Sequence, residues 1–405
     1  MRQHKESSAA HPQQNERWLG VWIRQNRLQK NWSQDGLCKG ICAVSYLSKI
    51  EQGKVIPAPE ILYALAAKLN GSWETDPDVL ARYRSLIDAQ YQYIFTLNAN
   101  DYTQSYADFE QYRAAIAASP FLLDCLLLEI WLDDRPKAEL DGLRCYLGAM
   151  SSRQHQLYLM LTDSQASVQL YPSAHTCYWA GIGEYEAGHY THAVELLTRA
   201  YSLASEDGEL YLQTSCRIFI GNCYANMLDV EQMQRHYHAA RKMSKALGQQ
   251  YNLNDIDYNL ASTQIETGDF ASAYQYFSGL SDPSALALHK LAICCEKLGD
   301  RQTAINALEK AHTAHQEFPD KEITDKMCDI VRYRMTHPDY LSDNGYGELL
   351  LDTFAEIRKN LPAGYAAFHL PWVLEWYREH RLYKDAFQLL LDFPIYSKNI
   401  PFSHE

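Results

Sequence analysis

The fold of the amino-terminal part of the chain can be inferred from residues 40–54, which read GICAVSYLSKIEQGK. Leu47 and Ile50 are spaced as the buried pair of a short helix, which we expect over residues 43–52. A glycine stands near each end of this helix, and glycine is typical of helix ends because it adopts the left-handed backbone conformation without steric strain. The stretch therefore predicts one short helix held between two sharp turns.

Three more helices are expected around this one. They are a helix that ends near residue 29, a short helix capped by Ser33 that reaches about residue 39, and a helix that begins at the Pro57–Pro59 turn. The apolar side chains that these helices are expected to bury are Trp18, Leu19, Trp22, Ile23, Ile61, Leu62, Leu65, Ala66 and Leu69. Two short helices about four residues apart, bracketed by two more, form a helix-turn-helix, whose second short helix can lie in the major groove of DNA.

This region resembles the lambda-repressor-like, or XRE, family of helix-turn-helix domains. The resemblance rests on Trp32-Ser33-Gln34, on residues 40–54 and on Pro57-Ala58-Pro59-Glu60-Ile61-Leu62. It implies that Gln34 clamps a DNA phosphate and that Tyr46 and Lys54 contact backbone phosphates. The residues expected to face the bases are Val44, Ser45, Ser48 and Lys49, which lie on the recognition helix away from its buried pair.

Two positions depart from the family pattern. Gly36 stands where the family carries a good helix former, which lowers local helix stability by about 1 kcal/mol. Val44 replaces a polar residue, and valine can contact a thymine methyl group but cannot hydrogen-bond a base edge. The base preference of the recognition helix is therefore open, and so is a role of this domain in protein contacts alone.

The charge of the chain is unevenly distributed. Residues 16–72 carry eight basic and four acidic side chains, or +4, and residues 1–15 add +1. Because the formal net charge of the whole chain is −13, residues 73–405 carry −18. A small basic head on a large acidic body predicts two functions in two domains. We expect a leader at 1–15, a helix-turn-helix domain at 16–70, a linker at 71–77 and a helical body at 78–405.

Composition and motifs argue against several classes of protein. The 405 residues contain no apolar run that could span a membrane, and the polar amino terminus lacks a signal-peptide core, so we expect a cytoplasmic protein. The ten cysteines are scattered without a CxxC pair, which argues against a disulfide framework and a zinc site. The sequence has no GxGxxG, Walker, HExxH or GxSxG motif, so we expect neither an enzyme nor a bound metal or cofactor.

The body repeats a pattern of small residues. Glycines at positions 188, 268 and 299 are each followed five residues later by alanine and preceded seven residues earlier by glycine or alanine. A looser copy contains Gly221, and a last copy from Leu374 to Ala386 lacks the glycine. This pattern resembles the tetratricopeptide repeat, or TPR, in which small residues let one helix pack closely on the next. Spacings of 40, 40 and 31 residues depart from the usual 34, so the repeats are degenerate, and we expect more helical pairs over residues 80–175.

TPR arrays form a superhelix whose concave face is lined by the first helix of each pair. With the small residue of each copy as an anchor, the positions expected to face inward are Tyr178, Ile182, Tyr185, Glu186, Ile218, Asn222, Ala225, Asn226, Tyr258, Ser262, Ile265, Glu266, His289, Ile293, Glu296 and Lys297. Aromatic, amide and acidic side chains together suit an extended peptide, and a solvated surface is the alternative. The candidate peptide contacts are Tyr178, Tyr185, Glu186, Asn222, Asn226, Tyr258, Ser262, Glu266 and His289.

A helix-turn-helix head on a degenerate TPR body resembles the RRNPP group of peptide-responsive transcription regulators, and most closely its NprR and PlcR branch. The resemblance implies a regulator that binds operator DNA and, in the TPR groove, a short re-imported signalling peptide of the quorum-sensing type. It also implies asparagines that hold the peptide backbone, for which Asn222 and Asn226 fit best. The acidic body favours a peptide with a free amino terminus or a basic residue. Peptide binding is expected to shift a conformational equilibrium and so the spacing of two heads on DNA.

Several alternatives stay open at this point. A homodimer is the expected oligomer, because operators for such heads are usually near-palindromic. The apolar stretch 387–391 is either part of a dimer face or a cap on the last repeat. Instead of peptide control, the body could act through a protein partner such as a response regulator, or the chain could be a phage or mobile-element repressor of the same architecture.

Overall fold

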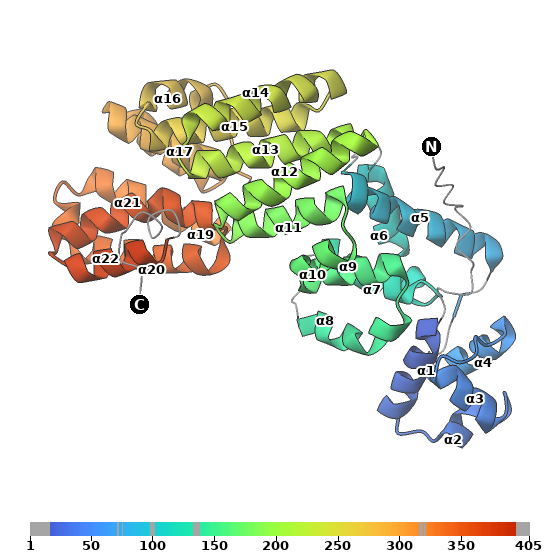
Figure 1. Ribbon diagram of the computed structural model, residues 1–405. Helices are drawn as coiled ribbons and strands as arrows, with labels where there is room; N and C mark the ends of the chain where they lie inside the picture. Colours follow the sequence, from blue (N-terminus) through green and yellow to red (C-terminus); the bar gives the residue numbers. More distant parts are fainter. Residues whose placement is uncertain are drawn as a thin grey trace, which may run out of the picture. The chain divides into compact units, whose positions relative to one another are not determined.

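The computed structural model describes residues 17–70, 73–74, 76–97, 102–132, 138–315, 319 and 321–393 of the chain. The expected leader lies outside these residues, as do Gly71, Ser72 and Thr75 of the expected linker. All regular structure in the described residues is helical, with no β-strand among them (Figure 1). The prediction of an all-α chain is confirmed. Each helix in the described part of the chain is too short or too polar to span a membrane.

The chain divides into two compact units, residues 1–176 and 177–405. The helices of the first unit are α1 (Arg17–Gln29), α2 (Gln34–Cys38), α3 (Val44–Glu51), α4 (Pro59–Asn70), α5 (Pro77–Thr96), α6 (Tyr102–Ala117), α7 (Leu122–Leu132), α8 (Ala138–Leu143), the 3-10 helix η2 (Arg144–Ala149), α9 (Ser152–Thr162) and α10 (Ser164–Leu170). The helices of the second unit are α11 (Ala174–Glu186), which begins just before the division, α12 (Tyr190–Asp207), α13 (Leu210–Asn226), α14 (Val230–Leu247), α15 (Gln250–Glu266), α16 (Phe270–Ser278), α17 (Ala285–Leu298), α18 (Arg301–Ala311), α19 (Lys321–Thr336), η3 (Tyr340–Ser342), α20 (Asn344–Asn360), α21 (Ala363–Glu379) and α22 (Tyr383–Leu391).

The four helices of the head begin and end close to where the sequence predicts. The Ser33 hydroxyl accepts a hydrogen bond of 3.0 Å from the backbone N–H of Gly36, and so caps α2. After α2 and α3 the chain turns at Gly40 and Gly53, whose φ angles of +81° and +65° are left-handed. Both helix ends therefore depend on the conformational freedom of glycine, as the sequence of residues 40–54 predicts.

The core of the head joins α1 to the two short helices. Leu47 and Ile50 of α3 are buried together with Trp18 and Leu19 of α1. At Gly20 the two helices touch directly, because an added Cβ would overlap the carbonyl oxygen of Ile50. The position of α3 in the head is thus fixed by backbone contact as well as by apolar burial.

The segment between the head and α5 is packed against both of its neighbours. Trp73 is buried, and its ring centroid lies 5.0 Å from that of Trp22 in α1. The backbone N–H of Glu74 donates to the carbonyl oxygen of Ala118 over 2.8 Å. Through these contacts the head and helices α5 to α9 share one hydrophobic core, within a compact unit that runs to Thr176. The expected domain boundaries stay a prediction.

The helix pairs of the second unit share one kind of turn. At Gly188, Gly268 and Gly299 the φ angles are +82°, +86° and +81°, and each N–H donates to the carbonyl oxygen three residues earlier. Leu228 and Arg381 make the same bond with a φ of +56°, although neither is glycine. The five turns are equivalent, and the consecutive paired helices form a TPR-like array (Figure 1).

Small residues let successive helices of this array approach each other. A Cβ added to Gly181 would lie 2.8 Å from the Cγ atom of Leu197, and one added to Gly221 would lie 2.5 Å from the ring of Tyr237. Ala261 occupies the equivalent place in the next copy and is buried. The residues chosen as anchors in the sequence are therefore the close contacts between the two helices of a pair.

Helix α21 packs against helices that are far from it in the sequence. Gly364, in its first turn, lies against the side chain of Asn226 in α13. One turn further on, His369 stacks on His289 of α17, with ring centroids 5.8 Å apart. Pro371 stands inside the helix and divides this first half from the second half, which is packed in the apolar core. The first half of α21 forms one wall of a cavity.

The last described helix, α22, covers one end of the core of the second unit. Leu389 and, just after the helix, Phe393 are buried, whereas the side chain of Phe387 is 48% exposed. The stretch 387–391 therefore serves as a cap through Leu389, and it leaves Phe387 on the surface.

Candidate functional site

Helix α3 presents a polar surface on the head. Its exposed side chains are Val44, Ser45 and Lys49, and Lys54 is exposed in the turn that follows. Ser48 is half-buried, and its hydroxyl accepts a hydrogen bond of 3.1 Å from the side-chain amide of Gln52. Tyr46 is half-buried against the core of the unit. The surface thus offers two lysines and a hydroxyl beside one apolar side chain, a combination that suits phosphates and base edges.

A buried ion pair holds α3 in place. The guanidinium group of Arg27 at the end of α1 donates to both carboxylate oxygens of Glu51, over 2.6 and 2.9 Å. The same guanidinium donates to the carbonyl oxygen of Trp32, and the side-chain amide of Gln34 donates to Glu51 over 2.8 Å. The pair therefore links the end of α1, the start of α2 and the end of α3.

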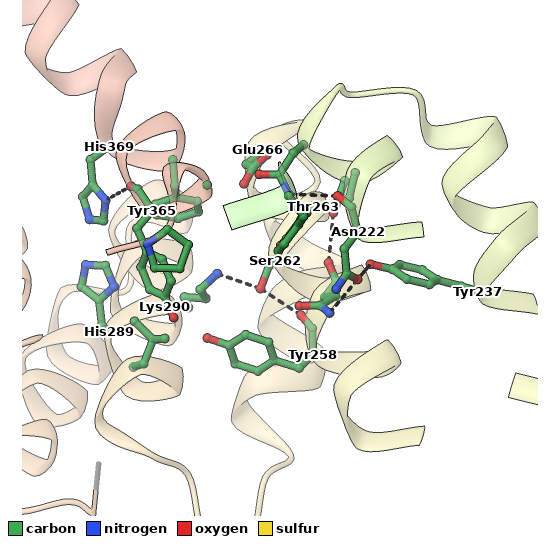
Figure 2. Close-up of a pocket in the computed structure, with 18 residues that line it drawn as sticks. Asn222, Tyr237, Tyr258, Ser262, Thr263, Glu266, His289, Lys290, Tyr365 and His369 are labelled. Atoms are coloured by element: carbon green, nitrogen blue, oxygen red, sulfur yellow. Dashed lines mark hydrogen bonds between the residues drawn. The ribbon is translucent and has the colours of Figure 1, made fainter. Parts of the chain in front are cut away.

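The second unit encloses a cavity of about 230 Å³ between α11, α13, α14, α15, α17 and α21 (Figure 2). The residues that line it are Tyr185, Asn222, Ala225, Asn226, Tyr237, Tyr258, Asn259, Ser262, Thr263, Glu266, Leu286, His289, Lys290, Pro362, Gly364, Tyr365, Phe368 and His369. Its wall combines aromatic rings with amides and only two side chains that carry a charge at neutral pH, Glu266 and Lys290. The acidity of the whole body does not extend to this cavity.

One side of the cavity carries three asparagines joined by hydrogen bonds. The Oδ1 atom of Asn222 accepts bonds from the Tyr237 hydroxyl over 2.6 Å and from the Nδ2 atom of Asn259 over 3.1 Å. Asn226 donates from Nδ2 to the carbonyl oxygen of Asn222 over 2.9 Å. Within the described residues, no hydrogen bond uses the Nδ2 donor of Asn222 or the Oδ1 acceptor of Asn259. One amide donor and one amide acceptor are therefore available to a ligand.

The opposite side of the cavity carries a lysine among aromatic rings. The Nζ atom of Lys290 donates to the hydroxyl of Ser262 over 2.7 Å and lies 5.1 Å from the ring centroid of Tyr258 and 4.6 Å from that of Phe368 (Figure 2). Burial lowers the pKa of Lys290 to about 8, against the opposing charge of Glu266. At neutral pH the amine is still mainly protonated. Desolvation by the surrounding protein likewise raises the pKa of Glu266, and Lys290 acts against this shift.

Two buried histidines lie beside this lysine. The rings of His289 and His369 are stacked, with an angle of 22° between their planes. Burial lowers the pKa of both, that of His369 to about 4, and the positive charge of Lys290 lowers both further. Both rings are therefore neutral at pH 7. The Nδ1–H group of His369 donates to the carbonyl oxygen of Tyr365 over 2.8 Å, so its Nε2 atom carries a lone pair.

The sequence model of the helix-turn-helix family matches residues 23–75. The head of this chain is a helix-turn-helix domain of the XRE type. A domain of this type indicates a DNA-binding transcriptional regulator rather than an enzyme. No curated protein matches the chain. In the described part of the chain, no three side chains of His, Cys, Asp or Glu gather in a way that could hold a metal ion.

The residues predicted to contact DNA differ in their exposure to solvent. Val44, Ser45, Lys49 and Lys54 are exposed, and Ser48 and Tyr46 are half-buried. Gln34 is also half-buried. One N–H of its side-chain amide donates to Glu51, which leaves the second N–H and the amide oxygen unused in the described structure. Contact of these residues with DNA stays a prediction.

Most of the residues predicted to contact a peptide lie at the cavity. Seven of the nine line it, namely Tyr185, Asn222, Asn226, Tyr258, Ser262, Glu266 and His289. Tyr178 does not, because its ring is buried between helices, 5.9 Å from the ring of Phe219. Glu186 does not either, since it is exposed at the last residue of α11. The anchor rule thus selects helices that line the cavity, but two of its candidates on α11 lie away from it. Contact of these residues with a peptide stays a prediction.

Other residues of the cavity wall were not predicted. They are Tyr237, Asn259, Thr263, Leu286, Lys290, Pro362, Gly364, Tyr365, Phe368 and His369. Asn259 and Lys290 directly follow the predicted Tyr258 and His289, so a broader helix face would have included them. The five residues at the start of α21 carry no local signal, because only the folded chain brings this segment to α13 and α17.

Proposed function

We propose that this chain is a transcription regulator controlled by a short peptide that binds in the cavity of the second unit, as in the RRNPP group that it resembles. The observation that carries the proposal is the unused Nδ2 donor of Asn222 beside the unused Oδ1 acceptor of Asn259. Each residue of an extended peptide offers one N–H donor and one carbonyl acceptor, which is the complement of this pair. The aromatic wall supplies apolar contacts for its side chains.

The size of the cavity limits how much of a peptide it encloses. Pockets for drug-sized ligands usually measure about 300–1,000 Å³, and this cavity measures about 230 Å³. It therefore suits one end of a peptide, with the remaining residues outside. Helices α13, α15, α17 and α21 all contribute to its wall, so a ligand that bridges them favours one arrangement of these helices over others.

The DNA-binding part of the proposal rests on the surface of α3. Lys54 supplies positive charge for a backbone phosphate and Lys49 a charged donor for base edges, and the buried pair of Arg27 and Glu51 keeps α3 in one orientation. A homodimer would present two such helices to a near-palindromic operator. For the peptide to control this binding, it must bind the DNA-competent and DNA-incompetent states with unequal affinity.

The experiment is a DNA-binding titration of the full-length chain against the promoter regions that flank its own gene. It is run with and without synthetic peptides taken from the carboxyl-terminal ends of neighbouring small open reading frames. We expect one peptide to change the DNA affinity about tenfold, which corresponds to a coupling free energy of about 1.4 kcal/mol. The Lys54→Ala variant should bind every DNA more weakly and with a smaller salt dependence.

A matched pair of variants tests the cavity. Asn259→Ala removes the unused acceptor and should reduce the effect of the peptide while DNA affinity without peptide is unchanged. Asn306→Ala, at an exposed position of α18, should leave the effect intact. Tight DNA binding that no peptide alters, or a peptide effect that survives Asn259→Ala in full, would contradict control through this cavity.

A further inference from the structure

The side of the cavity that faces away from the asparagines has an unusual electrostatic composition. The Lys290 amine lies between the Tyr258 and Phe368 rings and is directed to Ser262. The stacked rings of His289 and His369 line the same cavity, near enough for the charge of Lys290 to act on both (Figure 2). These three side chains come from α17 and α21, two helices that meet only through tertiary packing. A positive charge and two imidazoles are thus held together in a place walled by apolar rings.

Lys290 lacks an anionic partner. Among the described residues its one hydrogen bond goes to the neutral hydroxyl of Ser262, and no carboxylate lies within ion-pair distance of its amine. Glu266 is one turn beyond Ser262 on α15 and influences Lys290 only at longer range. An ammonium group that is removed from water is stabilised strongly by an adjacent anion, because the local dielectric constant is low. Two of its three protons remain available to bind one.

The histidines provide a second, independent observation. Both nitrogens of His289 and the Nε2 atom of His369 are buried without a hydrogen-bond partner in the described structure, and the His289 side chain has no exposed surface. Buried polar atoms without partners are rare, since each raises the free energy of the folded state. His289 has one N–H donor in either neutral tautomer, and His369 gains a second donor on protonation, which a nearby anion favours.

From this geometry we propose that Lys290, together with His289 and His369, forms a binding site for a carboxylate of the ligand. The inference rests on the proposed function, since it assigns one chemical group of the ligand to one side of the same cavity. The carboxylate is either the free carboxyl end of the peptide or an acidic side chain. An acidic group on the ligand differs from the earlier expectation. The net charge of the body favoured a ligand with a free amino terminus or a basic residue.

The test measures direct binding of three small probes to the full-length chain by isothermal titration calorimetry. N-acetylphenylalanine has a main-chain carboxylate, an amide and an aromatic ring, and N-acetylphenylalaninamide lacks only the charge. The α-benzylamide of N-acetylaspartate keeps a ring but carries the carboxylate on its side chain. We expect a carboxylate probe to bind at least tenfold more tightly than the uncharged amide. Whichever carboxylate probe binds more tightly distinguishes a peptide end from an acidic side chain.

Three variants assign the effect to residues. Lys290→Met should abolish the difference between acid and amide, and Lys297→Met, at an exposed position on the same helix, should preserve it. Glu266→Gln should strengthen binding of the acid several-fold, because it removes a like charge from the cavity wall. The comparison of acid with amide on the unaltered chain decides the question even where a variant does not fold.

Equal affinities for acid and amide, or no binding of either carboxylate at 20 mM, would overturn the carboxylate site. An acid preference that survives Lys290→Met would overturn it as well. These outcomes leave peptide control of DNA binding intact, because that control is measured separately by the DNA titration. Conversely, a clear preference for the acid, with no peptide that changes DNA affinity, would support the carboxylate site and contradict the proposed function.

Discussion

The recognition helix and the cavity are built in opposite ways. The residues proposed to contact DNA lie mainly within one short helix and the turn after it, and the pair that orients this helix spans only Arg27 to Glu51. The cavity, by contrast, is lined from Tyr185 to His369 by helices that meet only in the folded chain. A site on one helix can be predicted from the local sequence. A cavity lined by several helices depends on how the repeats stack and on which distant segment packs against them.

The largest effect is expected in the head, where the buried pair of Arg27 and Glu51 links α1 to α3. Arg27→Met leaves Glu51 buried without a counter-charge, and breaking a buried ion pair in this way costs about 3–5 kcal/mol. Urea unfolding followed by circular dichroism should show this loss in the free energy of unfolding, and DNA affinity should fall with it.

The control for Arg27→Met is a pair on the surface. Arg144 and Asp141 lie 3.7 Å apart with more than two thirds of each side chain exposed, so Arg144→Met should change stability by less than about 1 kcal/mol. The double variant Arg27→Met/Glu51→Leu should be less destabilised than the sum of its parts, because no charge is left buried. Equal effects of the buried and the surface variant would show that the pair does not organise the head.

The cavity has its own test, which depends on pH. Because burial places the pKa of His369 at about 4, below the value of about 6.5 in an unfolded chain, the unfolded state binds the proton more readily between these values. The contribution of this histidine to stability is complete above pH 6.5 and is lost as the pH falls to 4, by about 3 kcal/mol in total. His369→Phe should therefore reduce the loss of stability between pH 7.5 and pH 4.

Chemical unfolding at a series of pH values checks this expectation. His238 is exposed on α14, so His238→Gln should leave the pH dependence of stability as it is. A pH dependence that is identical in His369→Phe and in the unaltered chain would mean that the ring of His369 is accessible to protons in the folded state. In that case the wall formed by α21 would open readily.

Close helix packing in the body can be tested at a glycine beside the cavity. An added Cβ at Gly221 would lie 2.5 Å from the ring of Tyr237, whose hydroxyl donates to Asn222. Gly221→Ala should therefore destabilise the chain by about 2 kcal/mol and weaken peptide binding, since Asn222 loses its fixed position. Gly183→Ala, at an exposed site in α11 with no atom near the new Cβ, should instead stabilise by about 0.5–1 kcal/mol. Similar effects at both glycines would argue against the close contact.

The contrast also explains what the sequence could predict. The helix-turn-helix could be predicted because its signals are local: Ser33 caps the helix that follows it, and Gly40 and Gly53 form left-handed turns. The repeats were readable because small residues recur at fixed distances. The packed position of Trp73 was not, since the segment around it is polar and contains Gly71 and Pro77, which are typical of a linker.

The candidate site in the body was only half predictable for the same reason. Asn222, Tyr258 and His289 follow from their distance to a small residue on the same helix. Lys290 and His369 form one group only after α21 has packed on α17, and no periodicity within either helix indicates that event. Tyr178 shows the opposite failure, because the rule cannot distinguish a residue that faces the cavity from one that is buried between helices.

The smallest effect concerns the turns that define the repeats. Leu228 has a φ of +56° at the place where Gly188, Gly268 and Gly299 stand, and its side chain is 51% exposed. A left-handed conformation raises the energy of a non-glycine residue by roughly 1–2 kcal/mol, whereas a new glycine makes the unfolded chain more flexible, which offsets about 0.4–1 kcal/mol of the gain. Leu228→Gly should therefore stabilise the chain by up to about 1 kcal/mol. Leu298→Gly, at the exposed helical position just before Gly299, should destabilise it by a similar amount. Opposite changes in the free energy of unfolding would show that the left-handed turn, and not the loss of a leucine side chain, causes the effect at Leu228. Changes of the same sign would mean that Leu228 is not equivalent to the glycines of the other turns.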